Sequence, residues 1–368
     1  MNKTITALAI MMASFAANAS VLPETPVPFK SGTGAIDNDT VYIGLGSAGT
    51  AWYKLDTQAK DKKWKALAAF PGGPRDQATS AFIDGNLYVF GGIGKNSEGL
   101  TQVFNDVHKY NPKTNSWVKL MSHAPVGMAG HVTFVHNGKA YVTGGVNQNI
   151  FNGYFEDLNE AGKDQTAVDK INAHYFDKKA EDYFFNKFLL SFDPSTQQWS
   201  YAGESPWYGT AGAAVVNKGD KTWLINGEAK PGLRTDAVFE LDFTGNNLKW
   251  NKLAPVSSPD GVAGGFAGIS NDSLIFAGGA GFKGSRENYQ NGKNYAHEGL
   301  KKSYSTDIHL WHNGKWDKSG ELSQGRAYGV SLPWNNSLLI IGGETAGGKA
   351  VTDSVLISVK DNKVTVQN

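Results

Sequence analysis

The feature that most constrains the fold is a short apolar run ending in glycine, which recurs six times along the chain. The copies are TVYIGLG (residues 40–46), LYVFGG (87–92), AYVTGG (140–145), TWLING (222–227), LIFAGG (274–279) and LLIIGG (338–343). A turn rich in Asn, Asp and Gly precedes each run, and these residues supply the positive φ angles that two-residue hairpins require. The pattern predicts a series of small, similar β-sheets rather than one continuous sheet.

Tryptophans mark the same repeat independently. In five copies a third strand, a turn and a Trp-containing fourth strand follow the glycines; these tryptophans are Trp64, Trp117, Trp199, Trp250 and Trp316. Repeats with a double glycine after the second strand and a Trp before the fourth resemble kelch motifs, each of which forms one four-stranded propeller blade. We therefore expect an all-β, six-bladed propeller over residues 20–368. The sixth copy lacks its Trp, so we expect Ser20–Phe29 to supply its fourth strand and close the ring.

The first 19 residues have the features of a secretory signal. Lys3 precedes an apolar run from Ile5 to Ala17, and Ala17-Asn18-Ala19 provides small residues for cleavage after Ala19. The alternative is an N-terminal core helix. Removing residues 1–19 takes one lysine from 35 basic residues and leaves 34 against 34 acidic ones, a net charge of zero. This balance does not favour nucleic acid or a membrane surface as a partner.

Two loops between second and third strands are much longer than the others. They span about 146–186 and 280–305, and we expect them to cover one end of the propeller. In the first, Val168, Ile171 and Tyr175 recur at helical spacing, which predicts a helix. Because strands alternate in direction, these loops share a face with the links between blades. We expect ligands on this face.

All four arginines of the chain fall in segments of that face: Arg75, Arg234, Arg286 and Arg326. A guanidinium presents a planar fork of donors that matches a carboxylate, which a lysine cannot reproduce. The arrangement favours a small anionic ligand such as a carboxylated sugar, although solvated loop charges remain the alternative.

The fourth repeat departs from the others. Its run ends in Asn226-Gly227, and Glu228 and Arg234 follow across a Pro-Gly turn. A carboxylate oriented by a guanidinium can act as a general base, whereas a surface ion pair would contribute little. Glu344 occupies the equivalent position in the sixth repeat without an arginine in its loop.

Together with the signal, the six repeats and the two long loops, the segment NGEAKPGLRTD resembles the N-acetylneuraminate epimerase family, the sialic-acid mutarotases of Gram-negative bacteria. The resemblance extends over residues 20–368. It implies a periplasmic homodimeric enzyme that converts α-N-acetylneuraminate to the β-anomer without cofactor or metal and helps the cell to use sialic acid. It also implies that Glu228 and Arg234 serve the active site.

Anomer exchange needs a base for the anomeric hydroxyl and an acid for the ring oxygen. Glu228 is the expected base, and Arg234 is expected to hold the carboxylate or stabilise charge on oxygen. Arg75, Arg286 and Arg326 are weaker candidates for substrate binding. His131 is a candidate acid, although packing alone also explains a histidine there.

Two other functions remain open. A sialidase would show repeated aspartate boxes, and the chain has only a single incomplete match to that motif, SFDPSTQQW (191–199). A kelch lectin or scaffold could bind through the same face without catalysis. A copper oxidase of the galactose-oxidase type is excluded because its cofactor needs a cysteine and the chain has none.

Overall fold

Six antiparallel sheets follow one another in the computed structural model, which describes residues 21–245 and 248–368. We number them as blades one to six. Blade one contains β1 (Thr33–Asp37), β2 (Thr40–Gly44), β3 (Trp52–Asp56) and β4 (Lys65–Ala66). Blade two contains β5 (Arg75–Asp76), β6 (Thr79–Ile83), β7 (Asn86–Lys95), β8 (Thr101–Asn111) and β9 (Ser116–His123). Blade three contains β10 (His131–His136), β11 (Lys139–Gly144), β12 (Phe188–Asp193) and β13 (Gln198–Glu204).

The remaining blades follow the same order. Blade four contains β14 (Ala214–Lys218), β15 (Lys221–Ile225), β18 (Val238–Asp242) and β19 (Lys249–Leu253). Blade five contains β20 (Phe266–Ser270), β21 (Ser273–Ala277), β24 (Asp307–His312) and β25 (Lys315–Glu321). Blade six contains β26 (Val330–Trp334), β27 (Ser337–Ile341), β30 (Ser354–Lys360) and β31 (Lys363–Gln367).

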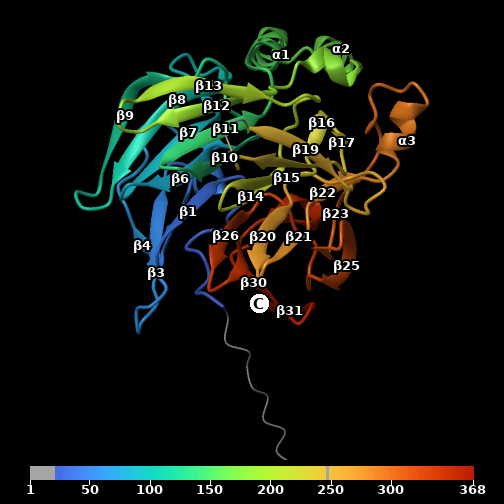
Figure 1. Cartoon of the computed structure of the whole chain (residues 1–368). Helices are drawn as coiled ribbons and strands as arrows, with labels where there is room; N and C mark the ends of the chain where they lie inside the picture. The colour runs from blue at the N-terminus through green and yellow to red at the C-terminus, as the bar shows by residue number, and fades with distance from the viewer. Residues whose placement is uncertain (1–20, 246–247) are drawn as a thin grey trace, which may run out of the picture.

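The blades form a closed ring. Their first strands, β1, β6, β10, β14, β20 and β26, lie nearest the centre (Figure 1), and each contacts the first strand of the next blade. Contact between β26 and β1 completes the circle. The structure is the six-bladed β-propeller that the repeats predicted.

The tryptophans that mark the repeats fill the seams between blades. Each packs against apolar residues of the preceding blade as well as its own: Trp64, Trp117, Trp199, Trp250 and Trp316. Large flat side chains are suited to this position because they bury much apolar area between two sheets. The recurrence of one tryptophan in each of the first five blades is therefore explained by packing.

Closure of the last blade differs from the prediction. β31 pairs with β30, so blade six takes all four strands from the C-terminal part of the chain. The N-terminal segment instead forms a β-bridge between Phe29 and Val351, and Leu22 and Phe29 are buried in the seam between blades six and one. The prediction of an N-terminal fourth strand was wrong, because the alternating sequence KVTVQ (363–367) already provides that strand.

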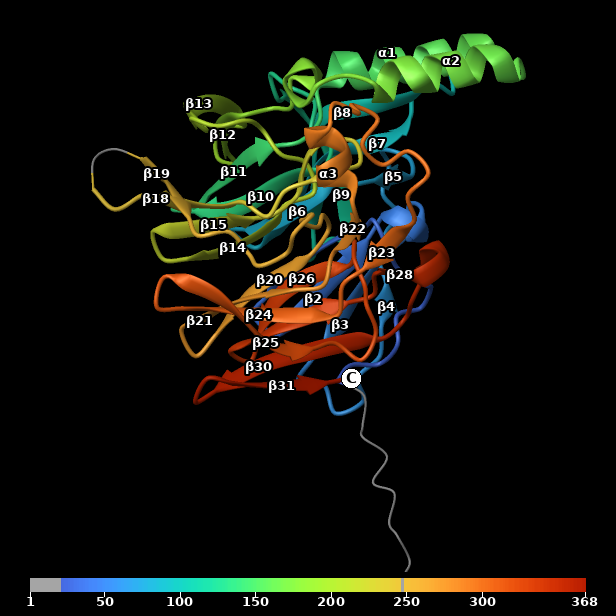
Figure 2. The ribbon, with the colours of Figure 1, turned by 90° about the vertical axis from the view of Figure 1, so that its right-hand side faces the viewer.

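The loops divide between two faces of the ring. Figure 2 shows the β14–β15 turn on one side and, on the other, two of the small hairpins formed in the loops. These hairpins are β16 (Glu228–Lys230) with β17 (Leu233–Arg234), β22 (Ala280–Phe282) with β23 (Lys302–Tyr304), and β28 (Glu344–Thr345) with β29 (Lys349–Ala350). We call the side that carries these hairpins the loop face.

Both long loops are structured. The loop of blade three holds α1 (Gln148–Ala161), α2 (Gln165–Phe176) and η2 (Ala180–Tyr183), so the predicted helix exists and a second precedes it. The loop of blade five holds α3 (Ser285–Gln290) between β22 and β23. Two further 3-10 turns are η1 (Gly46–Ala48) and η3 (Ala346–Gly348). Within the described ranges, no helix is long and apolar enough to cross a membrane. The predicted signal, residues 1–19, lies outside these ranges.

Candidate active site

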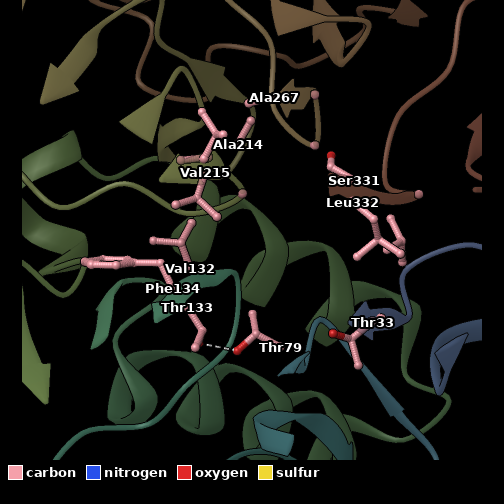
Figure 3. A pocket seen from close by; sticks show the side chains of 18 of the residues that line it. Thr33, Thr79, Val132, Thr133, Phe134, Ala214, Val215, Ala267, Ser331 and Leu332 are labelled. Carbon is pink, nitrogen blue, oxygen red and sulfur yellow. Dashed lines mark hydrogen bonds between the residues drawn. The ribbon is translucent and has the colours of Figure 1, made fainter. Parts of the chain in front are cut away.

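A cavity of about 910 Å³ runs through the centre of the propeller. Its walls are the first strands of the blades, as shown by Thr33, Thr79, Thr133, Ala214 and Ser331 in Figure 3. Much of this wall consists of small or apolar side chains. The charged groups Glu228, Arg234, Lys302 and Glu344 belong to the loop-face hairpins and line the same cavity. Its loop-face end therefore carries two carboxylates and two basic side chains, whereas Lys218 lines the cavity at the opposite end.

A ring of left-handed residues lines the cavity just before the first strands. They are Ser31, Gln77, Gly130, Gly212, Gly264 and Tyr328, with φ between 55° and 65°. Backbone hydrogen bonds link neighbouring members: the Gly264 N–H donates to the Gly212 carbonyl, and the Tyr328 N–H to the Gly264 carbonyl, each at 2.8 Å. Blades three, four and five use glycine, which tolerates this conformation. Tyr328 places a large side chain there.

Glu228 and Arg234 face each other across the β16–β17 hairpin. They are register partners, and the guanidinium forms an ion pair with the carboxylate through Nη1 and Oε2. The Gly232 N–H also points to Oε2 at 3.3 Å. The Pro-Gly turn therefore folds the chain back as the sequence predicted. It places the Glu228 carboxylate and the Arg234 guanidinium together at the cavity.

Arg234 is almost fully buried, with 7% of its surface exposed. Its Nε donates to the Ala280 carbonyl at 3.3 Å, and its Nη2 to the Tyr328 hydroxyl at 3.3 Å. The guanidinium carbon lies 5.3 Å from the centre of the Phe282 ring. Burial lowers the pKa of the guanidinium, while Tyr328 raises it. Every nitrogen of Arg234 thus has a partner within the protein.

Glu344 occupies the corresponding position on blade six but has different partners. It accepts hydrogen bonds from Lys30 Nζ at 2.7 Å, Lys302 Nζ at 2.5 Å and the Tyr304 hydroxyl at 2.6 Å. Burial acts to raise the pKa of its carboxyl, but these three donors outweigh that effect and lower it to about 2. Glu344 is therefore a fixed negative charge that holds Lys302.

His131 lies in the cavity wall on β10. Its Nε2 is 2.6 Å from the Thr79 hydroxyl, and burial lowers the pKa of the imidazole to about 3. The ring is consequently neutral near pH 7 and holds no readily released proton. These contacts favour a packing role over that of an acid.

The other three arginines pair with aspartates. Arg75 and Asp106 form a buried bidentate pair, and the buried Arg326 forms a second bidentate pair with the partly exposed Asp353. Arg286 on α3 reaches Asp236 of blade four, with both oxygen–nitrogen distances 3.1 Å. None of the three arginines belongs to the described lining of the central cavity. Their geometry favours bracing of blades and loops, because the terminal nitrogens of each guanidinium already bind an aspartate.

Lys230 fastens the two long loops to each other. Its Nζ, fully buried, donates to the carbonyls of Phe176 (2.9 Å), Lys178 (2.5 Å) and Asn294 (2.5 Å). Burial lowers the pKa of this ammonium to about 8. His297 of the second loop packs directly on Gly232, where an added Cβ would lie 1.7 Å from its Nδ1. The loops thus cover the hairpin that carries Glu228.

Asn226 is explained by its backbone. It replaces the first glycine of the repeat and has φ 60°, close to Gly91 at 56° and Gly278 at 65°. Asn enters this left-handed region more readily than most residues. The substitution therefore keeps the turn that leads into Glu228.

Sequence reasoning missed Lys302 and Tyr328. A signal for Tyr328 was present, because Ala-Gly at 129–130, 211–212 and 263–264 becomes Ala-Tyr at 327–328. Lys302 carried no such signal, since one lysine in a polar loop resembles any other. In the described part of the chain, no group of three or more His, Asp or Glu residues is arranged to hold a metal ion.

Comparison with known proteins identifies close relatives of the whole chain. A family model described as N-acetylneuraminate epimerase matches residues 22–366. N-acetylneuraminate epimerases of Escherichia coli strain K12 and Shigella boydii are 99% and 98% identical over 368 residues, covering 100% of both chains. A solved structure described as that of YjhT is 98% identical with a TM-score of 0.94, and the match covers 95% of this chain and 100% of that one.

Proposed function

Because the chain belongs to the N-acetylneuraminate epimerase family, we propose that it interconverts the α- and β-anomers of N-acetylneuraminate in the central cavity. The observation that supports this function best is Glu228 held by Arg234 at the loop-face end of a cavity of about 910 Å³. This volume is within the range of sites that enclose small ligands, roughly 300–1,000 Å³.

In the proposed reaction, Glu228 takes the proton of the anomeric hydroxyl while an acid protonates the ring oxygen. The bond between the anomeric carbon and the ring oxygen breaks, and a ketone forms. Rotation about the bond to the neighbouring methylene carbon presents the other face of the ketone. Reclosure returns both protons, so the product is the other anomer and no atom is gained or lost.

Arg234 orients Glu228 and stabilises negative charge that develops on oxygen. We assign recognition of the sugar carboxylate to Lys302. Glu344 accepts from its Nζ, which has three N–H donors, so others are available at the cavity. The side chain is 34% exposed, and this reduces the desolvation required on binding.

Proton NMR on N-acetylneuraminate tests the function. The α-anomer is generated by sialidase, and its conversion is followed with and without the protein. We expect the protein to accelerate conversion in both directions towards the same equilibrium. Binding without acceleration would support the lectin alternative instead.

A parallel sample containing a sialoside tests the hydrolase alternative. The account predicts no release of sugar from it. Release of sugar at a rate comparable with anomer exchange would contradict the proposal and favour a sialidase.

We further propose that the chain is exported to the periplasm, with cleavage after Ala19, and that it acts as a homodimer. The signal-like composition of residues 1–19 supports export, and the family resemblance motivates the dimer. Mass spectrometry of the mature N-terminus and light scattering of the purified protein test the two proposals separately.

A further inference from the structure

The acid that protonates the ring oxygen has no assigned residue in the proposed reaction. The cavity-lining groups already described do not suit it: His131 is neutral, and Glu344 is ionised with its oxygens engaged by Lys30, Lys302 and Tyr304. The donor must lie beside Glu228, since the anomeric hydroxyl and the ring oxygen are bonded to one carbon.

Tyr328 has an unusual backbone for its size. Its φ of 58° lies in the left-handed region, where a bulky residue is a genuine outlier. The equivalent residues of blades three, four and five are glycines. Strain of this kind persists where the surrounding structure enforces it and is concentrated at functional sites. The position places the Tyr328 side chain at the cavity.

The neighbouring residues accommodate the ring. A Cβ added to Gly264 would lie 2.3 Å from Cδ1 of Tyr328, so the missing side chain of blade five leaves the space that the ring fills. Lys302 Nζ lies 4.5 Å from the centre of the same ring. The phenol is therefore held between two adjacent blades, close to the proposed carboxylate-binding group.

The hydroxyl has one defined partner, Arg234 Nη2 at 3.3 Å. An arginine can only donate, so the phenolic oxygen accepts and its own proton is directed elsewhere. The residue lines the cavity, which leaves that proton available to a ligand. The guanidinium also stabilises the negative charge that forms on the phenolic oxygen as the proton departs.

We propose that Tyr328 is the catalytic acid of the anomer exchange, and this proposal rests on the function proposed above. Arg234 contacts Glu228 through one terminal nitrogen and Tyr328 through the other. One guanidinium thus holds base and acid side by side.

During ring opening, the anomeric O–H proton passes to Glu228 and the Tyr328 proton passes to the ring oxygen. The bond between that oxygen and the anomeric carbon breaks, and its electron pair remains on the oxygen that is protonated. On reclosure the tyrosinate recovers its proton from the attacking hydroxyl, and the glutamic acid protonates the ketone oxygen. Neither oxidant nor co-reactant is required.

Tyr328→Phe tests the proposal, because it removes the hydroxyl and retains the ring. We expect the kcat for anomer exchange to fall about 100-fold or more, the range typical of a lost general acid, while KM changes little. Tyr208→Phe is the matched control: its hydroxyl lies 3.2 Å from Thr235 Oγ1, and the residue is outside the central cavity lining. The control should retain wild-type kcat.

A second variant tests the proton itself. Incorporation of 3-fluorotyrosine at position 328 makes the phenol more acidic with little change in shape. When kcat is measured against pH, its decrease at alkaline pH should therefore begin at a lower pH than in the wild type. A decrease that begins at the wild-type pH, or a folded Tyr328→Phe variant with wild-type kcat, would overturn the assignment. If the wild type itself fails to accelerate exchange, the proposed function fails instead.

Discussion

Blades four and six carry a glutamate at the same structural position, and the two differ in what surrounds them. The N–H of Glu228 donates to Ala211 at 2.8 Å, and that of Glu344 donates to Ala327 at 2.6 Å. Both residues begin small hairpins on the loop face and line the cavity. The backbone therefore offers two equivalent sites for a carboxylate.

Partners decide the chemistry at each site. Glu344 is bound by two ammonium groups and a phenol from other parts of the chain. A carboxylate engaged in this way is a poor proton acceptor. Glu228 has one guanidinium and one backbone N–H, at 3.3 Å, both from its own hairpin. The comparison teaches that the same position of a repeated fold can carry the proposed base in one blade and a carboxylate that holds a cation in another.

The strongest test of this contrast exchanges each glutamate for its amide. Glu228→Gln should lower kcat for anomer exchange about 1,000-fold, within the range for loss of a general base. Glu344→Gln should leave most of kcat and raise KM, because Lys302 loses its partner. NMR exchange rates at several sugar concentrations separate the two effects. Equal losses of kcat would contradict the division of roles.

The next largest effect is expected for Arg234→Lys. An ammonium cannot hold Glu228 and the Tyr328 hydroxyl in one plane, so kcat should fall about 100-fold, comparable with the loss of a charge-stabilising donor. Arg286→Lys is the control, since its pair with Asp236 lies outside the cavity lining. Both variants are measured in the same NMR assay. Similar kcat values for the two would contradict the assignment of Arg234.

A smaller effect is expected for Lys302→Met, which removes the proposed carboxylate contact. KM should rise about tenfold, equivalent to roughly 1.4 kcal/mol, with a lesser change in kcat. Lys218→Met is the control, because Lys218 also lines the cavity but pairs with Asp272 on the opposite face. Titration calorimetry with N-acetylneuraminate checks the binding difference. An unchanged affinity of Lys302→Met for N-acetylneuraminate would contradict the proposed role of Lys302 in binding the sugar carboxylate.

The smallest effect concerns acid stability. The folded-state pKa of Glu344 is lowered from 4.5 to about 2. Its ionised form therefore stabilises the folded protein above about pH 4.5, and this contribution is lost as pH falls through about 2. Thermal unfolding of the wild type and Glu344→Gln between pH 6 and 2 should show midpoints that converge as the pH falls. A constant difference between them would contradict the ion-pair explanation.

Sequence periodicity was sufficient for the ring of blades, because each repeat carries its own turn, glycines and tryptophan. It failed at the last blade, where β31 has no tryptophan to mark it. The pairing of Glu228 with Arg234 was also predictable, since a Pro-Gly turn joins them. Local spacing could not place Lys302 near Glu344, because these residues meet only when blades five and six pack together.

The arginines show the same limit of prediction from the sequence. Their shared face follows from strand alternation, yet sequence does not reveal that Asp106, Asp236 and Asp353 engage three of them. Whether a charged group is free for a ligand depends on partners distant in the chain. The predicted site for an anionic ligand therefore depends on Arg234 and Lys302 rather than on four arginines.

The central claim is that Glu228 and its partners open and reclose the sugar ring by proton transfer. It is tested most directly with N-acetylneuraminate carrying ¹⁸O in the anomeric hydroxyl. Anomer exchange and label content are followed together by NMR and mass spectrometry, with a protein-free sample for background exchange. The account predicts rapid conversion with the label retained, because this oxygen never leaves its carbon. Loss of label to water in step with conversion would contradict it.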